Sequence, residues 1–290
     1  MVTQRVLKIN KDKGGPYNMK VSEGKTNKTK VIEYTSMNDF YKYICETPFN
    51  DSFRWADHYS VTSSANWTKT NNFEEAVQLM KNGWTDMSNK LTKELKVSEK
   101  NMQTVMKSKT TYGVAGYQAI VPLYLNGVPN NMASKKMVPI KQKVITLNKS
   151  INYSGSTDSD TIVKESLKAF KIVKKFEAQG YRCNLNVLLG ASRSEANYIL
   201  KIRVKNATEK LNLSKLAFPL VHPSMLRRLY LRWLEVFPGV PSSFVGGYGH
   251  PMSIDEMKDV VEFEKAEYIL PAKITADVDN INTIDDLGRI

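Results

Sequence analysis

The chain is poor in the residues from which catalytic, metal and disulfide sites are commonly built. Its 290 residues include only two cysteines, Cys45 and Cys183, and three histidines. A distant pair of cysteines cannot form a disulfide framework and is typical of core residues in a reducing compartment. The sequence also lacks a nucleophile elbow, a phosphate-binding glycine loop, a dinucleotide fingerprint and a zinc-ligand cluster. These absences favour a protein that is not an enzyme.

Long apolar segments are absent as well. No window approaches the roughly 18 consecutive apolar residues of a membrane-spanning helix, and the first residues lack the apolar stretch of a signal peptide. Apolar residues make up 41% and charged residues 24% of the chain, close to the average for globular proteins. The sequence therefore predicts a folded protein with no membrane partner, present in the cytoplasm where it is made.

Positive charge is in excess and unevenly distributed. Lys and Arg number 42 against 29 Asp and Glu, a net charge of +13, which predicts an anionic partner. Residues 1–32 hold eight basic and two acidic residues, and we interpret them as a basic N-terminal arm. Residues 251–290 hold four basic and ten acidic residues. The two ends could attract each other or a second copy of the chain, although charged termini are commonly unstructured.

Residues 33–139 have the spacing and the end signals of helices. One helix is predicted to begin after Ser36, another begins at Asn72, and a third is expected from about Asp86 to Lys107. We therefore expect a mainly helical region here, with a domain boundary in the loop-like residues before 140.

Residues 140–290 have a different pattern. A strand at 143–147, a helix at 160–179 and strands at 184–189 and 198–204 follow one another, which is typical of an α/β unit with a parallel sheet. The sequence thus predicts an α/β protein, α+β overall, in which a three-layer, Rossmann-like domain with a mostly parallel sheet follows the helical region and ends in the acidic segment.

A candidate metal site follows the first strand of this domain. Asn152, Ser154 and Ser156 resemble the Asp-x-Ser-x-Ser motif of von Willebrand factor A-type domains, and the resemblance implies a divalent cation at the carboxyl end of the sheet. Asn152 replaces the aspartate, so the anionic ligand that a hard cation prefers is missing. The favoured alternative is a Ser/Gly turn that caps the next helix, with no cofactor.

Two groups of basic residues are candidates for nucleic-acid binding. The predicted helix at 160–179 carries a lysine stripe at helical spacing, and a later helix carries three arginines beside Trp233. Such rows can neutralise phosphates, but they can equally be a solvated helix face or partners of the acidic segment. These residues are Lys164, Lys168, Lys171, Lys175, Arg227, Arg228 and Arg232.

Aromatic residues are concentrated between positions 55 and 84. Trp55, Tyr59, Trp67 and Trp84 lie there, close to Arg54 and Lys69. They could stack on the bases of a single strand, although a small core in a loop-rich segment is the commoner explanation.

Four separated segments form a pattern: residues 66–84, with Trp67, F-E-E-A at 73–76 and N-G-W at 82–84, and residues 114–132, 177–182 and 213–228. Together they resemble a family of uncharacterised tailed-phage proteins with the signatures W-x-G-T…F-E-E-A…N-G-W and V-A-G…V-P-x-x-L-x-G-x-P…M. Lys69 stands near the position of the usual glycine. The resemblance implies a phage origin and supplies no catalytic residues.

Together these features predict a phage-encoded, non-enzymatic accessory protein that binds nucleic acid through basic surfaces. It would act in the host cytoplasm during infection. The alternative is a virion, assembly or host-interaction protein that uses the von Willebrand A-like domain for contacts with phage or host proteins, or as a homo-oligomer.

Overall fold

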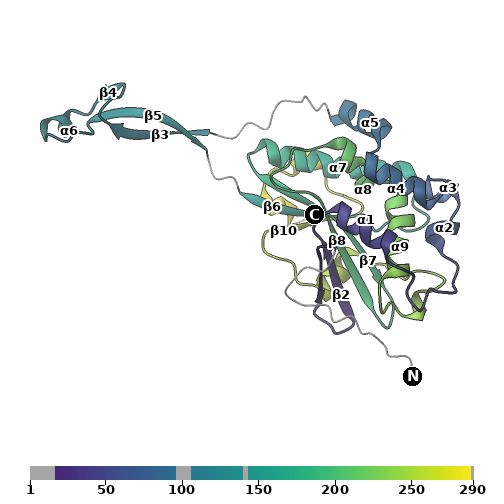
Figure 1. Cartoon of the computed structure of the whole chain (residues 1–290). Helices are drawn as coiled ribbons and strands as arrows, with labels where there is room; N and C mark the ends of the chain where they lie inside the picture. Colours follow the sequence, from purple (N-terminus) through teal and green to yellow (C-terminus); the bar gives the residue numbers. More distant parts are fainter. Residues whose placement is uncertain (1–16, 96–105, 140–142, 289–290) are drawn as a thin grey trace. The chain divides into compact units, whose positions relative to one another are not determined.

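The computed structural model describes residues 17–95, 106–139 and 143–288. The chain divides into two compact units, one formed by residues 1–97 and 144–290 and the other by residues 98–143. The larger unit is a mixed α/β structure built around one sheet (Figure 1).

Seven strands form the central sheet of the larger unit in the order β1-β2-β8-β7-β6-β10, with β9 paired to β7. They are β1 (Met19–Glu23), β2 (Thr29–Tyr34), β6 (Val144–Ser150), β7 (Arg182–Ser192), β8 (Asn197–Lys205), β9 (His250–Pro251) and β10 (Glu267–Leu270). Helix α7 (Ser159–Ala178) joins the parallel neighbours β6 and β7, as the sequence predicts. Among the described residues three of the six strand pairings are parallel, so the sheet is evenly mixed rather than mostly parallel.

Helices cover one face of this sheet and enclose the main core. α7 packs on β7, α8 on β8, and α1 on β2 and β8, while α4 and α5 pack against α8 (Figure 1). Alternate strand residues such as Leu147, Leu185 and Leu200 are fully buried in this core. The helical elements are α1 (Met37–Glu46), α2 (Tyr59–Thr62), α3 (Ala65–Thr68), α4 (Phe73–Asn82), α5 (Thr85–Leu95), α8 (Leu213–Val221), the π-helix η1 (Met225–Tyr230), α9 (Leu231–Val236), α10 (Ile254–Val260), α11 (Ile284–Leu287) and the 3₁₀ turns η2 (Ser242–Phe244) and η3 (Val278–Asn280).

The predicted helix starts are confirmed by their caps. The side chain of Ser36 accepts a hydrogen bond from the backbone N–H of Asp39, and Asn72 accepts one from Glu75. The third helix is described from Thr85 to Leu95 as α5, and residues 96–105 lie outside the described residues. It does not extend to Lys107 as expected, because strand β3 has begun by Met106.

The other face of the sheet is covered only in part. α10 packs there through Met257 against Leu188 and Ile199, in a small second core. Helix α10 approaches β7 closely, because a Cβ added at Gly190 would lie 2.7 Å from the terminal methyl of Met257. Further along the same face the strands carry polar side chains, and no helix of the described residues covers them, which leaves the groove described below.

The N-terminal boundary differs from the expected one. Residues 19–34 form the hairpin β1/β2, and β2 pairs in parallel with β8, so much of the expected basic arm is an edge of the sheet. Residues 1–16 lie outside the described residues. Helices α1 to α5 belong to the same compact unit as residues 144–290, so the larger unit is interrupted by the smaller one rather than preceded by a helical domain.

The smaller unit is a three-stranded antiparallel sheet with one short helix. β3 (Met106–Gly113) pairs along its whole length with β5 (Met132–Pro139), and β4 (Gln118–Ala119) pairs with the other edge of β5. α6 (Val121–Leu125) links β4 to β5. Gly116 allows the turn to pass against β5, because a Cβ there would lie 2.3 Å from the carbonyl oxygen of Ala133. We refer to residues 106–139 as the ribbon.

None of the helices in the described ranges has both the length and the apolar content required to cross a bilayer.

A histidine closes α8 within the core of the larger unit. The ring of His222 stacks on Phe218 and meets the edge of Trp84, and its Nδ1 accepts the backbone N–H of Ser224 at 3.1 Å. Burial lowers the pKa of His222 to about 4, below its ordinary value of 6.5. Between these values the unfolded chain binds more protons than the folded one, so stability falls as the pH falls through this window.

We expect His222 to contribute about 3 kcal/mol of acid destabilisation between pH 6.5 and 4. In His222→Asn the amide oxygen can accept from Ser224 without titrating, so most of this pH dependence should disappear from urea unfolding curves. His250→Asn, at an exposed position, is the control and should leave it unchanged. An unaltered pH profile in His222→Asn would contradict the assignment.

Candidate functional site

The residues of the metal-like motif are brought together at the carboxyl end of β6, where the amide of Asn152 bonds to the backbone of two other segments. Its Nδ2 donates to the carbonyls of Gly190 and Met252, and its Oδ1 accepts the N–H of Gly190. Ser154 and Ser156 bond to each other at 2.7 Å. No group of three His, Cys, Asp or Glu side chains that could hold a metal occurs in the described residues. The hydrogen bonds of Asn152 therefore make the motif a turn that ties β6 to β7.

The lysine stripe of α7 is divided between structure and solvent. Lys168 donates to the carbonyl of Ile274 at 2.6 Å, and Lys175 donates to that of Asp279 at 2.9 Å. The segment after β10 thus lies along the stripe. Lys164 and Lys171 are exposed. Half of the predicted stripe is therefore engaged by carbonyls of the C-terminal segment.

The three arginines face inward. Arg228 is fully buried in η1 and donates to the carbonyls of Ser60, Val61, Ser63 and Thr70. Arg227 donates to three further carbonyls and covers the ring of Trp67. The guanidinium of Arg232 lies over Phe49 and Phe73 and forms an ion pair with buried Glu235 at 3.6 Å. These contacts hold residues 58–70 on the helices and leave no guanidinium for phosphate.

The aromatic residues between 55 and 84 do not form one platform. Trp67 donates to Gly155, Trp84 packs on His222, and Tyr59 packs on Tyr248. Trp55 is 92% exposed. Three of the four therefore serve separate structural contacts.

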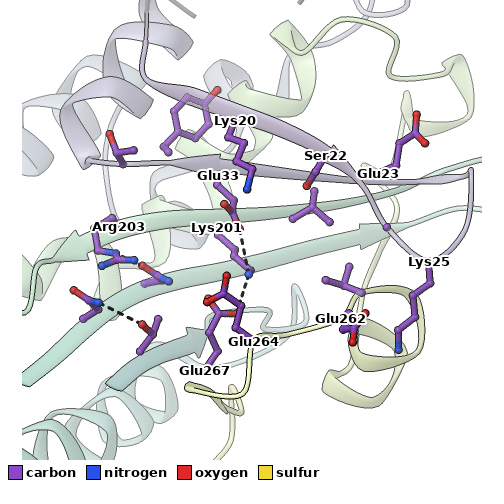
Figure 2. A pocket seen from close by; sticks show the side chains of 18 of the residues that line it. Lys20, Ser22, Glu23, Lys25, Glu33, Lys201, Arg203, Glu262, Glu264 and Glu267 are labelled. Atoms are coloured by element: carbon purple, nitrogen blue, oxygen red, sulfur yellow. Dashed lines mark hydrogen bonds and ion pairs between the residues drawn. The ribbon is translucent and has the colours of Figure 1, made fainter. Parts of the chain in front are cut away.

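The uncovered part of the sheet forms a polar groove of about 810 Å³. Its charged side chains come from strands β1, β2, β8 and β10 and from the segments around Lys25 and Glu262. Lys20, Glu33 and Lys201 are successive partners across β1, β2 and β8 (Figure 2). Lys201 lies between the carboxylates of Glu33 and Glu267 at 3.2 and 3.1 Å. Such a row of polar groups on strands is rigid, because each member holds the next.

A second row crosses the groove floor beside this ion triad. Arg203 donates through Nε to Asn186, and Asn186 donates to buried Asn148 at 2.7 Å. Burial lowers the pKa of Arg203, although nearby Glu267 opposes the shift. The groove as a whole is lined by four cationic and five anionic side chains. It has no excess of positive charge, so it suits a polar ligand of mixed charge better than a polyanion.

The ribbon has an uncompensated positive charge. Lys109 in β3 lies directly opposite Lys136 in β5. The sequence from 106 to 139 contains four lysines and no acidic residue. Like charges opposite each other on neighbouring strands are destabilising, unless an anion binds between or near them.

The ribbon also has unusually exposed apolar and aromatic side chains. Tyr112, Tyr117 and Tyr124 are 58, 61 and 66% exposed, and Leu125 is 76% exposed. Among residues 108–136, whose side chains the structure describes, the one buried side chain is that of Ala133. A surface of this composition on a unit with almost no core of its own is typical of a binding surface.

Sequence reasoning missed the ribbon as a site. The available signal was the four lysines, with no acidic residue, between 106 and 139. Strand pairing was needed to show that Lys109 and Lys136 face each other, since 26 positions of sequence separate them.

The fold and sites define a mixed α/β protein whose sheet is covered on one face and half open on the other, with an inserted ribbon. The chain belongs to the family described as "Domain of unknown function (DUF7192)", which matches residues 16–287. The matched range includes both units, so the ribbon lies within the family's domain. No curated protein and no solved structure matches the chain.

Removal of the groove lysine should destabilise the larger unit. In Lys201→Met the carboxylates of Glu33 and Glu267 lose the cation between them, and we expect a loss of about 3 kcal/mol in urea unfolding. Lys20→Met, in the same groove but exposed, should change stability by less than about 0.5 kcal/mol. Equal stability of the two variants would show that the triad is not an essential element of the groove.

Replacement of Arg228 should destabilise the larger unit at least as much as replacement of Lys201. Arg228→Met leaves several buried carbonyls without donors, and we expect a loss of more than about 3 kcal/mol. Arg54→Met, which removes an exposed ion pair with Asp51, should be almost neutral. Retention of full stability in Arg228→Met would contradict the structural role assigned to this side chain.

Proposed function

We propose that this protein binds nucleic acid through the ribbon. The observation that carries the proposal is the direct pairing of Lys109 with Lys136 on a strand pair that has no acidic residue between 106 and 139. A phosphate backbone would relieve the repulsion of the two ammonium groups and release its own counterions on binding.

The shape of the ribbon supports the same partner. A two-stranded ribbon is one of the elements that fit into the grooves or along the backbone of nucleic acids. Its two faces alternate residue by residue, so lysines are present on both: Lys135 shares a face with Tyr112, and Lys109 and Lys136 share the other. The α7 stripe, by contrast, has only Lys164 and Lys171 exposed.

The wider biological role is part of the same proposal. The sequence segments shared with tailed-phage proteins support a phage-encoded accessory protein that acts in the host cytoplasm without catalysing a reaction. The position of the Asn152 motif after the first strand of a βαβ unit supports a degenerate relationship to von Willebrand A-type domains.

An assembly role is the second candidate, and the exposed apolar residues of α6 favour it. Val121 and Leu125 are 61 and 76% exposed. They could insert into a phage or host protein or into a second copy of this chain. A concentration-dependent mass in solution, or the presence of the protein in purified virions, would support this candidate.

Matched double variants test the proposal. Lys109→Gln/Lys136→Gln should weaken binding to a labelled 20-nucleotide DNA and reduce the slope of log K against log salt concentration by about 1 to 2. Lys164→Gln/Lys171→Gln removes the same charge from α7 and is the control, with a smaller expected effect. Fluorescence anisotropy across a salt series measures both.

Two outcomes would contradict the proposal. One is the absence of binding by the wild-type protein at low ionic strength. The other is a larger loss of affinity in the α7 control than in the ribbon variant, which would place the phosphate contacts on the larger unit.

A further inference from the structure

We infer that the ribbon selects single-stranded nucleic acid, because its exposed tyrosines are available to stack on unpaired bases. This inference rests on the proposed function and names its substrate class. It concerns the side chains of Tyr112, Tyr117 and Tyr124, for which the sequence suggested no role.

Strand register places tyrosine and lysine on the same face of the ribbon. Tyr112 pairs with Ala133, and Lys135 lies two residues further along β5, so these side chains point to one side. Tyr117 follows in the turn, where its N–H bonds to the carbonyl of Ala133. The ammonium of Lys135 lies 5.8 Å from the centre of the Tyr117 ring. One face therefore offers an aromatic surface with a cation directly beside it.

The three rings are unusually accessible. Each is more than half exposed, and the Lys135 contact is the one ring interaction they make within the described residues. The small unit gains little stability from them, because they are not packed in a core. A tyrosine ring can cover a base with little loss of side-chain freedom, and base stacking of this kind contributes substantially to affinity.

This arrangement favours unpaired bases over a duplex or an acidic protein. In a duplex the faces of the bases are already stacked on each other, so a ring could reach them only after a base has been unstacked. An acidic protein would neutralise the lysines but would leave the rings without planar partners. A single strand offers phosphates and free base faces at the same time.

The first test compares a single strand with an abasic strand that has the same number of phosphates, and with a duplex that has at least as many phosphates. Wild-type protein is titrated against a labelled 20-nucleotide dT strand, the matching duplex, and a 20-unit strand of abasic sites. We expect the dT strand to bind at least tenfold more tightly than either of the others at the same salt concentration. Duplex binding as tight as dT binding, or equal affinity for the abasic strand, would overturn the inference.

The second test uses matched tyrosine variants. Tyr112→Ser/Tyr124→Ser should lose at least tenfold in affinity for dT, whereas Tyr112→Phe/Tyr124→Phe should stay within about twofold because phenylalanine also stacks. The salt slope should be unchanged in both, since the phosphate contacts remain. A serine variant that binds dT like the wild type would also overturn the inference.

Failure of the inference can be told from failure of the proposed function. If the protein binds strands and duplex equally, with a slope that depends on Lys109 and Lys136, the ribbon is a nucleic-acid surface without strand selectivity. If neither dT nor duplex binds at low salt, the proposed function itself fails. The exposed residues Val121 and Leu125 of α6 would then be candidates for a contact surface with protein partners.

Discussion

The fold depends on cationic side chains that donate to main-chain carbonyls of irregular segments. Arg228 and Arg227 hold residues 58–70 and the loop after β6 in this way. Lys149, which burial shifts to a pKa of about 7, donates to Pro271 and Ala272, and Lys168 and Lys175 continue along the same C-terminal segment. Buried carbonyls without donors are costly, and a long cation can reach several at once. These contacts, together with bonds such as that of Ser60 to Glu235, fix the irregular segments on the rest of the larger unit.

This constraint changes the meaning of the net charge of +13. A count of lysines and arginines treats each as a surface charge, yet many of them in the larger unit are used to satisfy backbone oxygens or, like Lys201, carboxylates. The positive charge available to an anionic partner is therefore smaller than the composition suggests. It also does not coincide with the lysine stripe that the helical spacing of the sequence predicts. In the ribbon the paired Lys109 and Lys136 have no carboxylate nearby in the sequence from 106 to 139.

Local features could be predicted from the sequence, whereas features that depend on pairing could not. The caps at Ser36 and Asn72 and the β6–α7–β7 unit follow from short-range patterns, and the structure confirms them. The hairpin β1/β2 was missed because an edge hairpin with alternating lysines resembles a disordered basic segment. The ribbon could not be predicted because its strands have no apolar face. The buried position of Arg228 could not be predicted either, because helical spacing does not reveal whether backbone carbonyls surround an arginine.

The two units differ in how much hydrophobic core they contain, and this difference determines what each can contribute. The larger unit has a core on both faces of part of its sheet, so its polar groove is held rigidly by strand pairing and buried neighbours. Within residues 108–136 of the ribbon Ala133 is the one buried side chain, so the backbone ladder supplies most of the order of this segment. A two- or three-stranded sheet of this kind is marginally stable in water. A partner that binds only the ordered ribbon also stabilises it. The repulsion between the lysines and the exposure of the tyrosines destabilise the free ribbon. Both become favourable contributions to binding when phosphates and bases are present.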